Sequence, residues 1–175
     1  MPKTYEPIAT ATLGSATATI SFTSIPLTYT DLAISVSANA TSSNHLYARW
    51  GNGSYDSGTN YSNTGMYTRT TTNDYGSERN NNFAFARLNP FTYGVPSATS
   101  TFGTTLVSLQ NYSNTTTFKT AITRVAGIGA DAYAGTEAGI ILWRSTAAIN
   151  QIQFSLPTGN FNAGTTITIY GIKAA

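Results

Sequence analysis

Apolar and polar residues alternate along much of this 175-residue chain. Between residues 16 and 22, alanine, isoleucine and phenylalanine alternate with threonine and serine. From Asp31 to Ala38 the same alternation places Leu32, Ile34 and Val36 on one face. A period of two residues is typical of a β-strand that buries one face. We therefore expect two strands here, and we expect them to be adjacent.

Further segments with strand character follow at short intervals. They are His45 to Trp50, Met66 to Thr72, Phe83 to Leu88, Thr104 to Tyr112, Phe118 to Val125, Ala138 to Arg144, Asn150 to Leu156 and Thr165 to Ile172. Turn signals rich in glycine, asparagine and proline separate them, and no segment has the period of an amphipathic helix. A total of about ten short strands favours an all-β fold, a two-sheet antiparallel β-sandwich of jelly-roll type. Residues 1–175 are expected to form this single domain.

Two stretches depart from simple alternation. Ala138 to Trp143 is apolar on both faces, which indicates a central strand covered on both sides or a strand that meets a partner subunit. The tract from Gly51 to Asn82 is long and polar, and it is interpreted as an elaborated loop region with one short strand inside.

Four tyrosines lie in this polar tract: Tyr55, Tyr61, Tyr67 and Tyr75. A tyrosine ring offers a large contact area and loses little conformational entropy on binding, so it suits protein interfaces and sugar stacking alike. Long loops on a rigid sandwich commonly carry binding sites. The four residues are therefore the candidate binding or interface loop, although tyrosine is also common in strands.

Composition narrows the possible partners. Charged residues make up 9% of the chain, against about 25% in typical soluble domains. The net charge is +2, and the basic residues are scattered, so no continuous basic surface for nucleic acid is expected. The N-terminus lacks the apolar core of a signal peptide, and no run approaches the roughly 18 apolar residues of a membrane span.

Few side chains in the sequence could support catalysis. His45 is the one histidine and there is no cysteine, which leaves little material for a metal site or a catalytic triad. The seven acidic residues are dispersed and mostly fall in expected turns. Asp56 lies among possible oxygen ligands for calcium, but the spacing departs from an EF-hand loop, and an ordinary turn is favoured. We expect no enzymatic activity, no cofactor and no metal.

Several segments resemble small virion proteins and fibre-tip domains of tailed bacteriophages, particularly marine and cyanobacterial phages. The resembling segments are Tyr5 to Thr10, Ile20 to Leu32, Gly51 to Ser54, Asn60 to Ser62, Tyr112 to Thr115, Phe118 to Thr120, Leu142 to Ile149, Gly159 to Phe161 and Tyr170 to Lys173. They consist of turn residues and alternating strand positions. No functional residue is carried over, because the matching motifs contain no catalytic group.

The resemblance implies a virion-associated β-sandwich, a homotrimer, made in the host cytoplasm and placed on the particle surface. Three functions stay open. A capsid decoration, or cement, protein would contact the major capsid protein, and a chain that starts at Met1 without a coiled-coil segment favours it. A fibre or spike tip would bind a host surface glycan and would need a fibre protein as partner. A polysaccharide-degrading enzyme has the least support in the residues.

Overall fold

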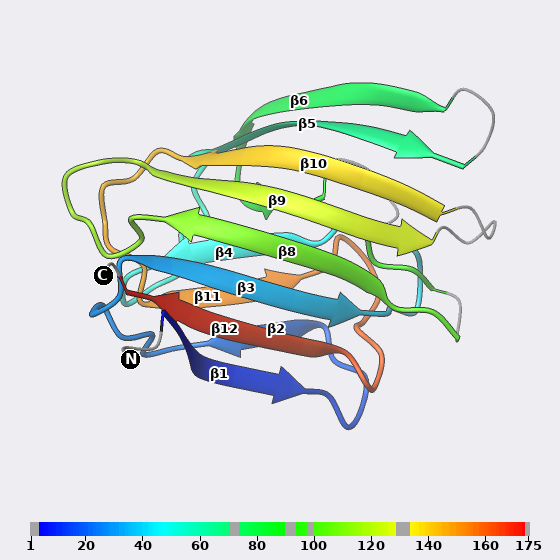
Figure 1. Cartoon of the computed structure of the whole chain (residues 1–175), viewed down its shortest axis with the longest axis horizontal. Helices are drawn as coiled ribbons and strands as arrows, with labels where there is room; N and C mark the ends of the chain where they lie inside the picture. The colour runs from blue at the N-terminus through cyan, green and yellow to red at the C-terminus, as the bar shows by residue number, and fades with distance from the viewer. Residues whose placement is uncertain (1–3, 71–73, 90–93, 98–99, 129–133, 174–175) are drawn as a thin grey trace.

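The computed structural model describes residues 4–70, 74–89, 94–97, 100–128 and 134–173. These residues form 12 strands and no helix, arranged as two antiparallel sheets that face each other (Figure 1). The expected all-β, two-sheet antiparallel architecture is confirmed. The jelly-roll connectivity stays a prediction.

The larger of the two sheets, called the large sheet below, has eight strands. Their order is β1 (Tyr5–Thr12), β12 (Thr166–Ile172), β3 (Asp31–Ala38), β8 (Gly103–Gln110), β9 (Lys119–Ile128), β10 (Ala134–Trp143), β5 (Tyr61–Arg69) and β6 (Tyr75–Phe83). The small sheet has four strands, in the order β2 (Thr19–Phe22), β11 (Gln151–Ser155), β4 (Tyr47–Gly51) and β7 (Ala86–Arg87). All strand neighbours pair antiparallel.

The hydrophobic core fills the space between the inner faces of the two sheets. Alternation along β3 buries every second side chain, including Leu32, Ile34 and Val36. Opposite them, Ile152 and Phe154 of β11 are fully buried. Burial of such side chains is the main stabilising contribution available to a chain without disulfides.

An aromatic cluster closes one end of the core. The rings of Trp50, Tyr61 and Trp143 lie with their centroids about 6 Å apart, Trp50 edge-on to each of the other two. Edge-to-face contacts of this kind add to the stabilisation from burial. Lys119 is also fully buried here, opposite Trp143 in the sheet, and its ammonium group donates hydrogen bonds to the carbonyl oxygens of Thr117 and Thr146.

The expectation that residues 16–22 and 31–38 form adjacent strands is wrong. The first segment contributes β2, which pairs with β11 in the small sheet, whereas β3 pairs with β12 and β8 in the large sheet. The connection between them crosses from one sheet to the other. Both strands bury one face in the same core, so their patterns are alike although they never touch as neighbours.

Two further expectations need correction. Strand β10 is not covered on both sides, because Ile141 is 1% exposed but Ile140 on the opposite face is 52% exposed. The alternative, contact of this strand with a partner subunit, stays a prediction. The polar tract is not a loop region with one short strand, because β5 and β6 form a long hairpin within it. Threonine, serine, asparagine and glycine occupy both faces of this hairpin, so an apolar period of two is missing.

Candidate functional site on the outer face of the large sheet

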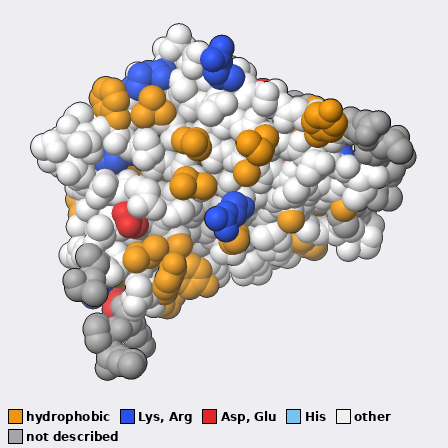
Figure 2. All heavy atoms as spheres, turned by 45° about the horizontal axis from the view of Figure 1, so that its top comes forward, with side chains coloured by type: hydrophobic (Ala, Val, Ile, Leu, Met, Phe, Trp, Pro, Cys, Tyr) orange, Lys and Arg blue, Asp and Glu red, His pale blue; other side chains and the backbone are white. Residues whose placement is uncertain are grey.

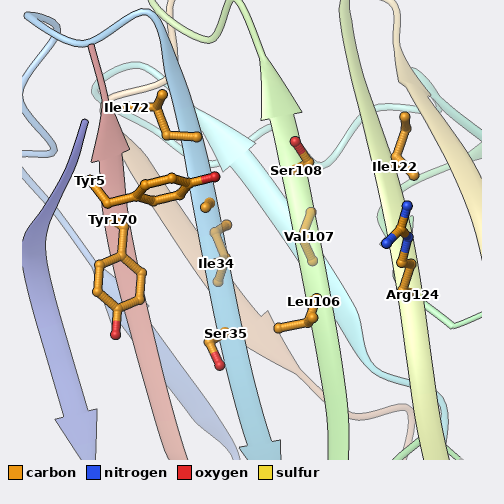
Figure 3. A pocket seen from close by; sticks show the side chains of 11 residues that line it. Tyr5, Ile34, Ser35, Leu106, Val107, Ser108, Ile122, Arg124, Tyr170 and Ile172 are labelled. Carbon is orange, nitrogen blue, oxygen red and sulfur yellow. The ribbon is translucent and has the colours of Figure 1, made fainter.

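The face of the large sheet that points away from the small sheet has a hollow of about 620 Å³. Its base consists of small side chains, Ala33 and Ser35 of β3 and Ser108 of β8. Larger side chains surround the base: Tyr5, Leu106, Ile122, Arg124, Tyr170 and Ile172. The hollow therefore spans β1, β12, β3, β8 and β9 (Figure 3).

Two tyrosines form one wall of the hollow. Tyr5 of β1 is paired with Ile172, and its ring extends across β12 toward β3 (Figure 3). Tyr170 lies along β12, opposite Ala33 in the sheet. Tyr5 is 58% exposed and Tyr170 is half-buried, so both rings offer a face to a ligand. Aromatic faces of this kind can stack on apolar surfaces, including those of sugars.

Aliphatic side chains form the other wall and continue beyond it. Leu106, Ile122 and Ile140, here called the outer stripe, are each about half exposed (49%, 51% and 52%). Ile122 and Ile140 are direct cross-strand neighbours, and Leu106 lies diagonally from Ile122 on β8. Figure 2 shows hydrophobic side chains in separate groups among polar atoms on this side of the molecule.

The hollow carries one positive charge at its rim. Arg124 is exposed on β9, opposite Leu106. The ion pairs between described residues join Arg69 to Asp74, Arg87 to Glu78 and Lys173 to Glu6, and they leave the Arg124 guanidinium unpaired in this part of the chain. An exposed arginine can bind a carboxylate or phosphate through two parallel hydrogen bonds.

The structure does not bring the four tyrosines of the polar tract together. Tyr61 is fully buried in β5, and its hydroxyl accepts a hydrogen bond from the backbone N–H of Trp50 at 2.9 Å. Burial raises the pKa of Tyr61 far above its ordinary value. Tyr61 is therefore a core residue. This corrects the sequence interpretation, which assigned it to a candidate binding loop.

The other three lie in different settings. Tyr55 is partly buried in the turn after β4, where it bridges to Gly51. Tyr67 on β5 is paired with Gly76, and Tyr75 on β6 is paired with Thr68. Paired residues share a face and successive residues alternate between faces, so the two tyrosines point to opposite faces of the hairpin. Tyr75 is 74% exposed and lines a second hollow, of about 540 Å³, with Met66 and Thr136. Tyr67 is also among the residues that line this hollow. The structure therefore brings two of the four tyrosines to one hollow, and Tyr55 and Tyr61 lie elsewhere.

The residues singled out for chemistry have local structural contacts. Asp56 accepts hydrogen bonds from the Trp143 indole (2.6 Å), the Asn60 amide (2.8 Å) and the Gly58 N–H (2.8 Å). These donors occupy both carboxylate oxygens, as in an ordinary turn. His45 stacks on Tyr47, and within the described ranges no three His, Cys, Asp or Glu side chains are grouped to hold a metal ion.

Sequence reasoning did not single out the hollow, although a signal for it exists. Leu106, Ile122 and Ile140 each stand at a position that the alternation assigns to the polar face of a strand. An apolar residue out of phase in this way marks an outward apolar side chain. The neighbouring tyrosines join the hollow only through the pairing of β1 with β12 and of β12 with β3, which no local pattern specifies.

Comparison with models of known protein families and with curated protein sequences finds no match for this chain. No described segment forms a helix of the length and hydropathy needed to cross a membrane.

Proposed function

We propose that this chain is a structural protein of a tailed-bacteriophage particle, a capsid decoration protein that attaches through the outer stripe of the large sheet. The observation that carries the proposal is the half-exposed row of Leu106, Ile122 and Ile140 on an extended, regular sheet face. Exposed apolar side chains that adjoin one another, as these three do, commonly mark contact surfaces. The resemblance to small virion proteins supports the major capsid protein as the partner that this surface contacts.

The chemistry of the face fits attachment by many weak contacts. Serine and threonine surround the stripe, and Arg124 is the basic residue beside Leu106. Interfaces that lack dense charge depend on shape and apolar contact, and repetition over a lattice multiplies a weak single contact. A rigid two-sheet domain loses little conformational entropy when it docks.

Copy number tests the placement on the particle. Quantitative mass spectrometry of purified virions should give hundreds of copies for each particle, in proportion to the major capsid protein. A handful of copies would instead indicate the tail and would contradict the decoration role.

A binding experiment tests the surface. Purified protein is added to capsids that lack it, and the bound amount is measured after sedimentation. Ile122→Lys and Ile140→Lys should each reduce binding about ten-fold or more, because a buried lysine ammonium is strongly unfavourable in an apolar contact. Thr19→Lys, on an exposed position of β2 in the small sheet, adds the same charge on the other side and should bind normally. Equal loss for all three variants would reject the outer stripe as the contact.

A second candidate function, a fibre-tip domain that binds a host surface glycan, is favoured by the hollow. Tyr5 and Tyr170 offer ring faces, and Ser35, Ser108 and Arg124 offer hydrogen-bonding groups. Glycan-array binding that is lost in Tyr170→Ala and Arg124→Ala but kept in Tyr55→Ala and Tyr75→Ala would support it. Absence of glycan binding by the unmodified protein would remove this candidate.

A further inference from the structure

In the described part of the chain, strand β6 is one of the two edge strands of the large sheet. It lies at the end of the strand order, paired on one side with β5, and Figure 1 shows it along the upper border of the molecule. An unpaired strand edge presents a row of N–H and C=O groups that another strand can bind.

The other sheet edges are shorter or interrupted. At the opposite end of the large sheet, β1 contains Pro7, which has no N–H, and its pairing shifts register between Pro7 and Ala9. The edge strands of the small sheet, β2 and β7, have four and two residues. By contrast, β6 has nine residues and no proline. It is therefore the edge best suited to pair with another strand.

Hydrogen bonding defines which groups of β6 point outward. The Arg69 N–H donates to the Asp74 carbonyl at 3.0 Å, so the backbone groups of Asp74 point toward β5. The direction of the backbone groups alternates along a strand, so the N–H and C=O groups of Gly76, Glu78 and Asn80 also point toward β5. The N–H and C=O groups of Tyr75, Ser77 and Arg79 consequently point to the open side.

The regular part of this edge has a definite centre. The register of β6 on β5 is constant from Tyr75 to Asn80, and it then shifts before Phe83. Asn82 has a φ of 59°, which marks the irregularity. With Asp74 included, the regular segment covers residues 74–80, and Ser77 is its midpoint.

We propose that two copies of this chain associate through β6, with the strands antiparallel and a two-fold axis at Ser77. Ser77 then faces Ser77 of the second copy, and Tyr75 faces Arg79. These are the outward-pointing residues, so about six hydrogen bonds join the copies. The two large sheets continue into one another across the axis. This association goes beyond the attachment role proposed above and does not depend on it. It differs from the homotrimer that the resemblance to virion proteins implies, and the mass measurement below distinguishes the two.

Side-chain pairing favours this register over its neighbours. With the axis at Ser77, the Arg79 guanidinium lies beside the aromatic ring of Tyr75 of the second copy, a favourable cation–π arrangement. Glu78 lies opposite Gly76, which has no side chain to clash with it. An axis at Glu78 would oppose two carboxylates, and an axis at Arg79 would oppose two guanidinium groups, each unfavourable in a directly facing pair.

A single introduced cysteine tests the register, because the chain contains no cysteine of its own. Facing residues of a hydrogen-bonded pair have Cα atoms about 5.5 Å apart, within the range for a disulfide. Mild oxidation of Ser77→Cys should therefore give a disulfide-linked dimer. Asn81→Cys is the matched control, exposed on the same strand but about 27 Å from its counterpart, and it should stay monomeric on a denaturing gel. Absence of crosslinking in Ser77→Cys, or equal crosslinking in both variants, would overturn the proposal.

Mass measurement provides an independent test on the full chain. Native mass spectrometry and light scattering should show a dimer for the unmodified protein. Ser77→Pro removes an N–H that the single chain does not use, and it should raise the dimer dissociation constant about ten-fold or more, while Ser77→Ala should leave it unchanged. Circular dichroism confirms that Ser77→Pro keeps its strand content. A monomeric or trimeric mass for the unmodified protein would overturn the proposal.

Discussion

The indole nitrogen of Trp143, at the end of β10, donates a hydrogen bond of 2.6 Å to a carboxylate oxygen of Asp56, in the segment after β4. This bond ties a turn of the small-sheet side to the last residue of a central strand in the large sheet. Because the Trp143 ring is 2% exposed, its N–H has little access to water as an alternative acceptor.

Removal of the carboxylate should therefore destabilise the fold. We expect Asp56→Ala to lower the free energy of unfolding by about 1–3 kcal/mol, since it leaves the indole N–H without an acceptor. Urea unfolding followed by tryptophan fluorescence measures the change. Asp74→Ala, which removes a partly exposed ion pair with Arg69, is the control and should cost less than about 1 kcal/mol. Equal losses in the two variants would contradict the importance of the Trp143 bond.

The same carboxylate should make stability depend on pH in acid. Burial opposes ionisation of Asp56, but hydrogen bonds from Asn60, Trp143 and Gly58 outweigh it and lower the pKa of Asp56 below its ordinary 3.8. The unfolded chain then binds the proton first, so this stabilisation is present above pH 3.8 and is lost as the pH falls through the folded-state pKa. The stability difference between the unmodified protein and Asp56→Asn should shrink below about pH 4. A difference that stays constant in acid would exclude this role.

The hydroxyl of Tyr61 should contribute to stability rather than to binding. It accepts a hydrogen bond of 2.9 Å from the backbone N–H of Trp50 in the core. Tyr61→Phe leaves that N–H without this partner and should lower the free energy of unfolding by about 1–3 kcal/mol. Tyr75→Phe removes a hydroxyl from a side chain that is 74% exposed and should be neutral. Differential scanning calorimetry compares the two. A neutral Tyr61→Phe would mean that water or another group satisfies Trp50.

A buried threonine should be replaceable with a gain in stability. Thr123 is 1% exposed, and its hydroxyl has no hydrogen-bond partner in the described part of the chain. Thr123→Val keeps the shape and removes the unsatisfied group, so we expect a gain of about 1 kcal/mol. The reverse change at its cross-strand neighbour, Val107→Thr, should cost about 1–3 kcal/mol. Chemical denaturation measures both, and a destabilising Thr123→Val would show that the hydroxyl is bonded in solution.

Close packing on Gly171 gives a further prediction. A Cβ atom at this position would lie 2.4 Å from the Tyr29 ring, whose hydroxyl donates to Glu6 at 2.8 Å. Gly171→Ala must displace the ring and should lower the free energy of unfolding by about 1–3 kcal/mol. Gly14→Ala, with open space around it, should be neutral in the same thermal unfolding assay. If both are neutral, the Tyr29 ring moves without cost.

The sequence predicts the one-sided strands of this fold well and the two-sided polar ones poorly. In β3, Leu32, Ile34 and Val36 alternate with small or polar residues, so the pattern identifies both the strand and its buried face. In β6, Tyr75 to Asn82 contains no apolar period, and its strand state depends on pairing with β5. Propensity cannot supply that information, because the partner lies elsewhere in the chain.

The sequence predicts only part of the candidate site, because here too the outcome depends on which strands pair. Tyr61 and Tyr75 have similar polar surroundings along the chain, yet one is in the core and the other is exposed. The out-of-phase positions of Leu106 and Ile122 do indicate an outward apolar surface. Which tyrosines stand beside them follows from the strand order, which local patterns do not encode.

The strand order also constrains how the chain can fold during synthesis. Among the described residues, β1 pairs with β12 in the large sheet, and β2 pairs with β11 in the small sheet. Both N-terminal strands can therefore pair only after the last two strands, β11 and β12, have been synthesised. Contacts between residues so far apart carry a high loop-closure entropy and slow folding. Nascent chains that end before β11 should thus expose β1 and β2 as unpaired, aggregation-prone segments.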